Sequence, residues 1–251
     1  MKYFGVVSYL GENYFGFQRQ KDKPSVQGVL EKWISHLLDA PTEIKAAGRT
    51  DAGVNAHGQT FSFVGREVKD CEAFRRSLNR LLPEDVFVKS LCFVPMEFDA
   101  RHSSVSKVYS YHFSFGERDP FLKGRVTQLQ RRGFDWDSFE AGLRVFEGKH
   151  NFQNFTSKSG DIDGFIREIE PISIIKNPDM QGGVVTFKGN GFMTYQIRFM
   201  MGAAFKCAFH LLEPEEVKRL LNAEPRHIVS YKAAAEGLYL ERVEYGKNLE
   251  L

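Results

Sequence analysis

The sequence predicts an α+β protein made of two ferredoxin-like halves with mainly antiparallel sheets. Three observations support this fold class. Short segments such as 3–9 alternate in side-chain character with the period of two that is typical of a strand. Other segments, such as 25–39, repeat apolar residues three and four positions apart, as helices do. These segments follow one another in the order βαββαβ twice along the 251 residues, which is the order of a ferredoxin-like unit.

The first half is predicted to span residues 1–103. Its first helix starts at Ser25, a residue type that often caps helix N-termini. Its second helix ends before Pro83, because proline has no backbone N–H to continue the helical hydrogen bonds. The elements expected in this half are strands at 3–9, 43–47, 59–64 and 86–94 and helices at 25–39 and 71–82.

The second half, residues 104–251, repeats this order. A long alternating segment, 106–115, predicts its first strand. The segment from Phe192 to His210 is apolar with few breaks, so we expect a mostly buried helix there. The other elements expected are helices at 137–148 and from Pro214, and strands at 171–177, 183–189 and 237–245. The duplication concerns the order of elements, with no convincing repeat of residues.

Composition excludes several classes of protein. The 34 basic and 32 acidic side chains leave a net charge of +2, so an anionic partner must be met by a local patch. No run of about 18 apolar residues and no secretory cleavage site occurs, so we expect no membrane span and a cytoplasmic location. Three separated cysteines and seven scattered histidines predict neither disulfides nor a metal site, and no cofactor motif is present.

Two long segments, 116–136 and 148–167, lack clear periodicity. Loops of that length in a compact domain are usually functional or disordered. Basic and aromatic residues occur together in both, and together they can bind phosphates and stack on bases. A solvated surface loop with buried phenylalanines explains the same composition equally well. The residues concerned are Arg118, Lys123, Arg125, Arg131, Arg132, Lys149, His150, Phe152, Phe155 and Lys158.

The segment GRTDAG (48–53) places an arginine, a threonine and an aspartate between small residues. Gly48 and Gly53 allow the chain to turn sharply, and the small neighbours leave room for a large ligand. Asp51 could simply accept local backbone hydrogen bonds. Arg49 would instead favour the ionised form of Asp51 by lowering its pKa. An ionised, accessible carboxylate is what nucleophilic catalysis requires.

GRTDAGV (48–54), with Gly58 and Gln59 downstream, resembles the signature of the tRNA pseudouridine synthase A (TruA) family. Further blocks extend the resemblance over nearly the whole chain. They are YFGFQRQ (14–20), SVQGVLE (25–31), FDARHSSVSKVYSY (98–111), GKHNFQNFTS (148–157), GFMTYQIRFMMG (191–202) and AAAEGLYLERVEY (233–245). The resemblance implies the pseudouridine synthase fold, in which two halves join across a central cleft. It also implies a homodimer that binds tRNA and needs no cofactor.

The resemblance implies isomerisation of uridine to pseudouridine in the anticodon arm of tRNA, at positions 38 to 40. Asp51 matches the catalytic aspartate, and Arg49 matches the arginine that helps to hold the target nucleotide out of the stack. Tyr109 matches the first tyrosine of a YxY pair and would lie against the flipped uracil, although a strand tyrosine is often only a core residue. Arg198 is expected to be buried and to pair with Asp51 across the two halves. The other matching arginines, expected to contact RNA or the cleft, are Arg101 and Arg167.

Some residues depart from the family pattern. Asn55 and Asp99 stand where histidine is usual, and Thr194–Gln196 replace residues that are commonly histidine or hydrophobic. We expect these positions to contact RNA, so the sequence does not fix the preferred uridine or tRNA. One alternative is therefore an RNA-binding module that has lost or narrowed its activity. Another is a nucleosidase or glycosidase, which normally needs a second catalytic acid that no residue near the matched blocks supplies.

Overall fold

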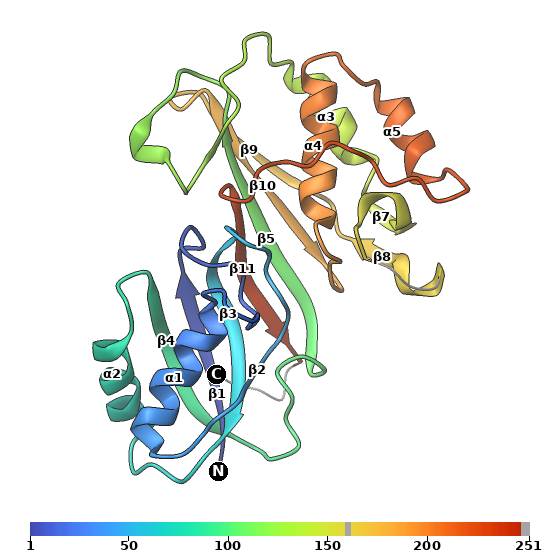
Figure 1. Cartoon of the computed structure of the whole chain (residues 1–251). Coiled ribbons are helices and arrows are strands. Elements are labelled where there is room, and N and C mark those ends of the chain that lie inside the picture. The colour runs from blue at the N-terminus through green and yellow to red at the C-terminus, as the bar shows by residue number, and fades with distance from the viewer. Residues whose placement is uncertain (159–161, 247–251) are drawn as a thin grey trace. The chain divides into compact units, whose positions relative to one another are not determined.

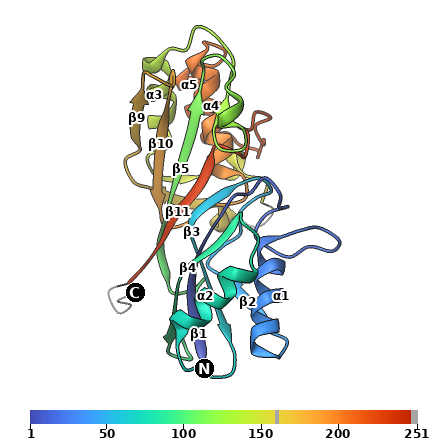
Figure 2. The same cartoon turned by 90° about the vertical axis from the view of Figure 1, so that its left-hand side faces the viewer.

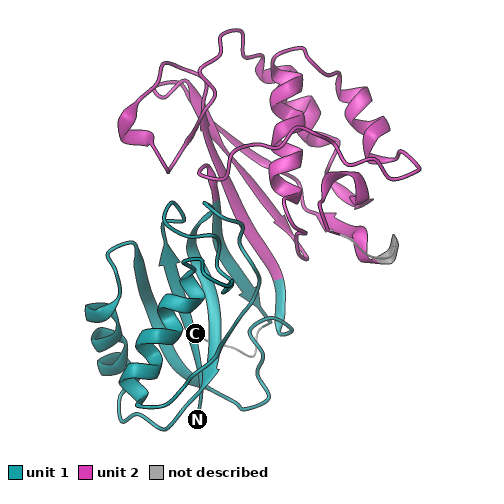
Figure 3. Ribbon diagram, viewed as in Figure 1, with its two compact units in different colours: residues 1–105, 239–251 teal, residues 106–238 magenta. Residues whose placement is uncertain are grey.

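Residues 1–158 and 162–246 are described by the computed structural model of the chain. The chain forms two compact units, residues 1–105 with 239–251 (unit 1) and residues 106–238 (unit 2), shown in Figure 3. Each unit combines a mainly antiparallel sheet with helices, which confirms the predicted α+β class. The longest helices among the described residues have 13 residues, and none of them has the length and hydropathy needed to cross a bilayer.

Unit 1 has the predicted βαββαβ order, followed by one strand from the end of the chain. Its elements are β1 (Lys2–Tyr9), α1 (Val26–Leu38), β2 (Ile44–Ala46), β3 (Asn55–Val64), α2 (Cys71–Leu81), β4 (Val86–Val94) and β11 (Leu238–Tyr245). β1 lies between β3 and β4 and is antiparallel to both, and β2 is antiparallel to β3. Both helices pack on one face of this sheet (Figures 1 and 2).

Local sequence explains the two helices of unit 1. The Ser25 hydroxyl accepts a hydrogen bond from the backbone N–H of Gly28 and caps α1. The helix ends where Asp39 adopts the left-handed conformation, with φ of 52°. The Asp70 carboxylate caps α2 in the same way, by accepting from the N–H of Glu72. Between helices and sheet, stacked rings fill the core, with Tyr3 against Phe63 at 4.6 Å and against Phe74 of α2 at 6.4 Å.

The last strand, β11, packs in unit 1, whereas the predicted division at residues 103/104 groups it with the second half. Its first residues pair in parallel with the start of β3, Tyr239 opposite Asn55. The Tyr245 ring meets the Phe4 ring edge-on at 5.3 Å, and its hydroxyl is hydrogen-bonded to Thr60 and to the Ala100 carbonyl. These contacts join residues far apart in sequence, so the local pattern of 237–245 could not reveal them.

Unit 2 is more elaborate than the predicted second half. Its elements are β5 (Ser104–Ser114), η1 (Pro120–Leu122), β6 (Thr127–Gln128), α3 (Trp136–Arg144), β7 (Gly148–Asn151), η2 (Gln153–Phe155), η3 (Ile162–Phe165), β8 (Ile166–Ile169), β9 (Ser173–Asn177), β10 (Gly182–Gly189), α4 (Gln196–Ala208) and α5 (Pro214–Leu221). β10 is antiparallel to β5 on one side and to β9 and β8 on the other, and β8 pairs with β7. β6 runs parallel to the end of β5.

Sequence periodicity missed β7 and β8; β7 lies in the segment 148–167, which was expected to be irregular, and β8 begins there and ends at Ile169. β7 reads Gly-Lys-His-Asn and has no apolar alternation, so only its pairing with β8 makes it a strand. The buried apolar helix predicted at 192–210 is shorter, because Tyr195 has a positive φ of 63° and α4 starts after it. The core of unit 2 is aromatic, with the Phe113 ring 5.2 Å from Phe139 of α3 and 5.1 Å from Phe205 of α4.

Candidate active site

The loop 47–54, which carries Asp51, joins β2 to β3 at one edge of the unit 1 sheet. β2 pairs with the second half of β3, where Ala46 lies opposite Phe61. β11 pairs with the first residues of the same strand. Because β2 and β11 occupy different parts of one edge of β3, the loop leaves the sheet between them. The sheet therefore presents a short loop at a position fixed by three strands.

The segment that follows β1 holds the loop backbone on both sides of Asp51. The N–H of Phe17 donates to the carbonyl of Thr50 at 3.3 Å. The N–H of Gly53 donates to the carbonyl of Tyr14, also at 3.3 Å. Asp51 lies between these two anchors, and its side chain is partly buried. Its backbone position is thus set by contacts with residues more than 30 positions away.

Glycines shape the loop and the segment that holds it. Gly53 has a φ of +77°, as the sequence predicted, whereas Gly48 is not among the described glycines with positive φ. Gly16 has a φ of +96°, and a Cβ at this residue would lie only 2.5 Å from the Thr50 carbonyl oxygen. A side chain there would push the segment off the loop and break the Phe17 hydrogen bond. The block YFGFQRQ (14–20) therefore holds the loop in place.

Two buried polar side chains bind the loop from within the sheet. The Tyr9 hydroxyl, on a side chain only 4% exposed, shares a 2.7 Å hydrogen bond with the Thr50 hydroxyl. Gln59 of β3 is fully buried, and its Nε2 donates to the Gly48 carbonyl at 3.0 Å. Burial raises the pKa of Tyr9, so its hydroxyl keeps its proton for this network. The residues next to Asp51 are therefore tied to the sheet core.

Arg49 is exposed at the start of the loop. That Arg49 favours the ionised form of Asp51 stays a prediction. An exposed guanidinium two residues from a carboxylate can also meet an anionic or planar ligand.

Two residues of unit 1 that depart from the family pattern, Asn55 and Asp99, have structural roles. Asn55 is fully buried, and its Oδ1 accepts a 2.8 Å hydrogen bond from the N–H of Gly11. The expectation that Asn55 contacts RNA is therefore wrong, because a buried side chain cannot reach a ligand. Asp99 accepts hydrogen bonds from the backbone N–H groups of His102 and Arg101, at 3.0 and 2.9 Å, and these lower its pKa. Asn55 therefore joins two distant segments, and Asp99 fixes the turn that follows it.

Tyr109 lies on β5 in unit 2 and is 8% exposed. Its ring meets Phe192 edge-on at 5.3 Å. Tyr111 is fully buried, and its hydroxyl bonds to the Thr127 hydroxyl and to the Ala234 carbonyl, both at 2.8 Å. Tyr109 is therefore slightly exposed, whereas Tyr111 is fully buried in the core.

Arg198 is in the first turn of α4 and is half-buried, so the prediction of a buried arginine is too strong. Its Nε donates to the Ala233 carbonyl at 2.8 Å, and its own carbonyl accepts from the Ala233 N–H at 2.9 Å. The guanidinium lies over the Tyr195 ring at 5.2 Å, and Lys232 Nζ lies over the same ring at 3.8 Å. Two cations on one ring concentrate positive charge at the start of α4.

At Thr194–Gln196, the backbone of Thr194 and the side chain of Gln196 make structural hydrogen bonds. The Thr194 carbonyl accepts a 2.9 Å hydrogen bond from the Thr156 hydroxyl. Gln196 is fully buried, and its Oε1 accepts from the N–H of Met193 at 2.9 Å. The expected RNA contact of Gln196 is therefore wrong for the same reason as that of Asn55. Thr194 is exposed and Tyr195 is partly exposed.

Arg101 is exposed in unit 1, and Arg167 is half-buried on β8 in unit 2, opposite His150 of β7. Burial lowers the pKa of the Arg167 guanidinium. Arg167 Nη1 and Lys158 Nζ donate to the same Gly164 carbonyl, at 3.3 and 3.2 Å. Because these two cations lie close together and repel each other, a phosphate bound beside them would be stabilised by both charges.

The aromatic residues of the segment 148–167 do not stack on bases. Phe152 and Phe155 are fully buried, and the Phe155 ring meets Phe146 at 4.9 Å. The alternative of buried phenylalanines is therefore the correct one for this segment. Its basic residues stay at the surface, with Lys149 exposed.

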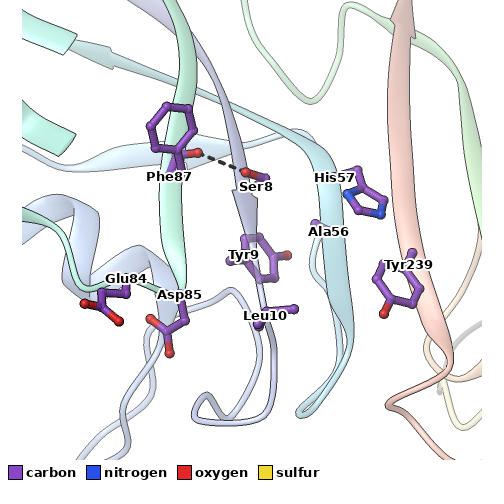
Figure 4. A pocket seen from close by; sticks show the side chains of 9 residues that line it. All are labelled: Ser8, Tyr9, Leu10, Ala56, His57, Glu84, Asp85, Phe87 and Tyr239. Atoms are coloured by element: carbon purple, nitrogen blue, oxygen red, sulfur yellow. Dashed lines mark hydrogen bonds between the residues drawn. The ribbon is translucent and has the colours of Figure 1, made fainter. Parts of the chain in front are cut away.

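Unit 1 also holds a cavity of about 200 Å³, drawn in Figure 4. Ser8, His57 and Tyr239 line its walls, and the His57 and Tyr239 rings stack at 5.1 Å. Tyr9 lines it as well, but none of the predicted site residues does. The cavity thus lies against the side chain that anchors Thr50 and does not contain the Asp51 carboxylate.

The predicted residues are divided between the units, with Arg49, Asp51 and Arg101 in unit 1 and Tyr109, Arg167 and Arg198 in unit 2. Sequence reasoning missed Tyr9 and Lys232. Tyr9 looked like any alternating strand residue, and Lys232 lies in no motif, so only tertiary contacts identify them. Within the described residues, no three His, Cys, Asp or Glu side chains gather as a metal site would require.

Comparison with known proteins relates this architecture to one family. The family model described as tRNA pseudouridine synthase matches residues 6–103 and 143–246. The chain is 35% identical to tRNA pseudouridine synthase A of Methylacidiphilum infernorum, over 98% of this chain and 96% of that protein. It is 32% identical to the protein of that name in Streptococcus gordonii, over 97% and 98% of the two chains. A crystal structure of a Cbf5-Nop10-Gar1 complex aligns with 11% identity and a TM-score of 0.39, over 94% of this chain and 57% of that one.

Proposed function

Because the chain belongs to the tRNA pseudouridine synthase family, we propose that it converts uridine to pseudouridine at positions 38 to 40 of the tRNA anticodon arm, with Asp51 as the catalytic carboxylate. The family establishes the broader activity, an isomerisation that makes pseudouridine in tRNA. The observation that carries the role of Asp51 is its anchored loop, since a catalytic carboxylate must be held in place while its side chain stays open to a ligand.

The reaction needs no group from outside the substrate. The N1–C1′ bond of uridine breaks, the base turns, and a C5–C1′ bond forms. The proton on C5 then leaves, and N1 takes up a proton, so atoms and electrons balance. Asp51 could attack C1′, attack C6 or remove the 2′ proton. Each route needs an ionised carboxylate beside the ribose and base.

Three other residues have proposed roles around the flipped uridine. Arg49, exposed beside the loop, would occupy the gap in the stack or hold a phosphate, which offsets a cost of a few kcal/mol for extruding a base. Tyr109 would lie against the uracil and assist loss of the C5 proton. Arg198 would pair with Asp51 and hold it ionised. The half-buried position of Arg198 and its bond to Ala233 support this role, because they fix the guanidinium.

The pairing of Arg198 with Asp51 can be tested by a double-mutant cycle. We expect Arg198→Gln and Asp51→Asn each to reduce turnover strongly and the double variant to lose little more than either alone, because both act on one carboxylate. Independent, multiplicative losses would mean that the two residues act separately.

Arg101 and Arg167 are proposed RNA contacts. Both are cations with exposed or half-exposed side chains, and the Arg167 guanidinium lies near Lys158. If they bind phosphates, each substitution by glutamine should reduce the dependence of tRNA affinity on salt by about one unit of slope. We also propose a homodimer in the cytoplasm. Sedimentation velocity and cell fractionation test these two points.

The function is tested by incubating the purified protein with an unmodified tRNA transcript and mapping pseudouridine in the product. We expect pseudouridine at one or more of positions 38 to 40, and none with Asp51→Asn. Binding without any product would favour an RNA-binding module that has lost activity. Release of free uracil would favour a nucleosidase. Mapping tRNA from cells with and without the protein then identifies which uridines it modifies.

A further inference from the structure

Phe121 is the most exposed large apolar side chain in the described residues, at 88%. Between Val105 and Lys158, no other large apolar side chain of the described chain is classed as exposed. A phenyl ring left in water forgoes the free energy that burial would supply. The exposed ring therefore either has no function or binds a ligand.

The loop that carries Phe121 holds the backbone of that residue in a defined place. Asp119 caps the short helix η1 by accepting a 2.8 Å hydrogen bond from the Phe121 N–H. The Asp119 backbone makes two hydrogen bonds to the Gln128 side chain, at 2.6 and 2.9 Å. Pro120 restricts the backbone between them. The ring thus projects from a fixed turn, so binding it would cost little backbone conformational entropy.

The base of the loop is anchored to the sheet. β6 pairs in parallel with the end of β5, where Ser114 lies opposite Gln128. The N–H of Leu129 donates to the Ser114 carbonyl at 2.8 Å. Val126, at the end of the loop, is buried. These contacts make the loop a rigid projection of unit 2.

The charges around Phe121 favour a nucleic acid. Arg118, Lys123 and Arg125 are all exposed on this loop. Glu117 is exposed too, whereas the Asp119 carboxylate is occupied by its cap. An aromatic ring among exposed cations is the arrangement that binds single-stranded nucleic acid, because bases stack on the ring while cations meet the phosphates. An apolar protein contact would need a larger patch than one isolated ring.

We infer that Phe121 is a stacking platform for an unpaired base of the RNA substrate, with Arg118, Lys123 and Arg125 at the adjoining backbone. This inference rests on the proposed tRNA substrate and adds a contact to it. Stacking does not need a particular base, since every base has a π-face. Phe121 would therefore raise affinity without choosing the uridine that reacts.

Two substitutions separate stacking from simple apolar contact. Phe121→Leu keeps an apolar side chain but removes the ring, and Phe121→Trp enlarges the ring. We expect Phe121→Leu to weaken binding of an unmodified tRNA about 5- to 100-fold and to raise KM in proportion. Phe121→Trp should bind at least as tightly as the wild type. The control is Ile175→Ala on β9, which removes another exposed apolar side chain of unit 2, 62% exposed, and should change binding less than about twofold.

The stacked base can then be located. A series of anticodon stem-loops, each with a single abasic nucleotide, is titrated against the wild type and Phe121→Leu. One abasic position should weaken wild-type binding and leave Phe121→Leu unaffected, because the partner of the ring is already missing. Lack of any such position overturns the inference.

Other outcomes also decide the matter. The stacking inference is overturned if the Phe121→Leu variant binds tRNA like the wild type. It is also overturned if the main defect of this variant is loss of self-association in sedimentation, because the ring would then make a protein contact. The proposed function is judged separately, by pseudouridine formed by the wild type. A wild type that binds tRNA but makes no product leaves the stacking result intact, and one that binds no tRNA overturns both.

Discussion

Two loops of this chain carry residues with proposed functions, Asp51 and Phe121, and the two loops are held in opposite ways. The Asp51 loop, 47–54, is fixed by residues from distant parts of unit 1. These are the side chains of Tyr9 and Gln59 in the sheet and the backbone of Tyr14 and Phe17. The Phe121 loop of unit 2 is fixed mostly by its own residues, Asp119 and Gln128. One loop depends on the tertiary fold, and the other is a nearly self-contained turn.

The difference matches what the proposed roles of Asp51 and Phe121 would require of the two loops. A catalytic carboxylate loses activity when it moves by about an ångström, so its loop must be set by the rigid core. A stacking ring tolerates small displacements, because stacking is not strongly directional, and a local turn is enough. We therefore expect damage to the first loop to lower kcat and damage to the second to raise KM.

The largest effect is expected for Asp51→Asn. It should reduce single-turnover pseudouridine formation at least about 1,000-fold and leave tRNA affinity within a few-fold, because the amide cannot supply the ionised oxygen. Phe121→Ala should show the reverse pattern, with weak binding and near-normal turnover at saturating tRNA. Rates come from quenched reactions and affinities from filter binding. Appreciable turnover by Asp51→Asn would remove Asp51 from its assigned role.

Gly16→Ala should be the next most damaging change. Its φ of +96° and the 2.5 Å approach to the Thr50 carbonyl oxygen leave no place for a methyl group, so we expect a loss of about 2–3 kcal/mol in unfolding free energy and a lower kcat. Gly124→Ala, at φ +71° in the Phe121 loop, is the matched control. It should cost about 1–2 kcal/mol and leave kcat unchanged. Urea unfolding and steady-state kinetics measure both, and equal kcat values for the two variants would contradict the comparison.

Thr50→Val tests the buried anchor of the Asp51 loop. Removing the Thr50 hydroxyl leaves the buried Tyr9 hydroxyl without this partner, which should cost about 1–3 kcal/mol of stability. Adding Tyr9→Phe removes the other partner, so the double variant should recover part of that loss. Thermal unfolding of the two single variants and the double variant gives the coupling. Additive losses would show that the 2.7 Å bond contributes nothing specific.

The smallest effect is expected for Asp119→Ala. Loss of this cap should cost about 1 kcal/mol and loosen η1, because the Phe121 N–H loses its acceptor. We expect tRNA affinity to fall only a few-fold and kcat to stay constant. Asp119→Asn should retain most of the affinity, since an amide oxygen can still cap the turn. A drop in kcat for Asp119→Ala would mean that the two loops are not independent.

Much of unit 1 was predictable because its signals are local. The caps at Ser25 and Asp70 and the alternating residues of β1 lie within a few positions of the elements they define. The motif at 48–53 pointed to Asp51 because its residue types are informative without any contact. The exposure of Phe121 and the polar strand β7 gave no such signal, since burial and pairing depend on the rest of the chain.

The sequence by itself determined the order of elements in the first half and the family, and it singled out Asp51 as the candidate carboxylate. Only the tertiary structure decided that β11 packs against Phe4 and β3, that Asn55 is buried, and that Tyr9 anchors Thr50. The physical reason is the distance along the sequence between interacting residues. Periodicity and capping act between residues a few positions apart, whereas these contacts join segments separated by 40 residues or more, and no local pattern encodes which distant partner a side chain will meet.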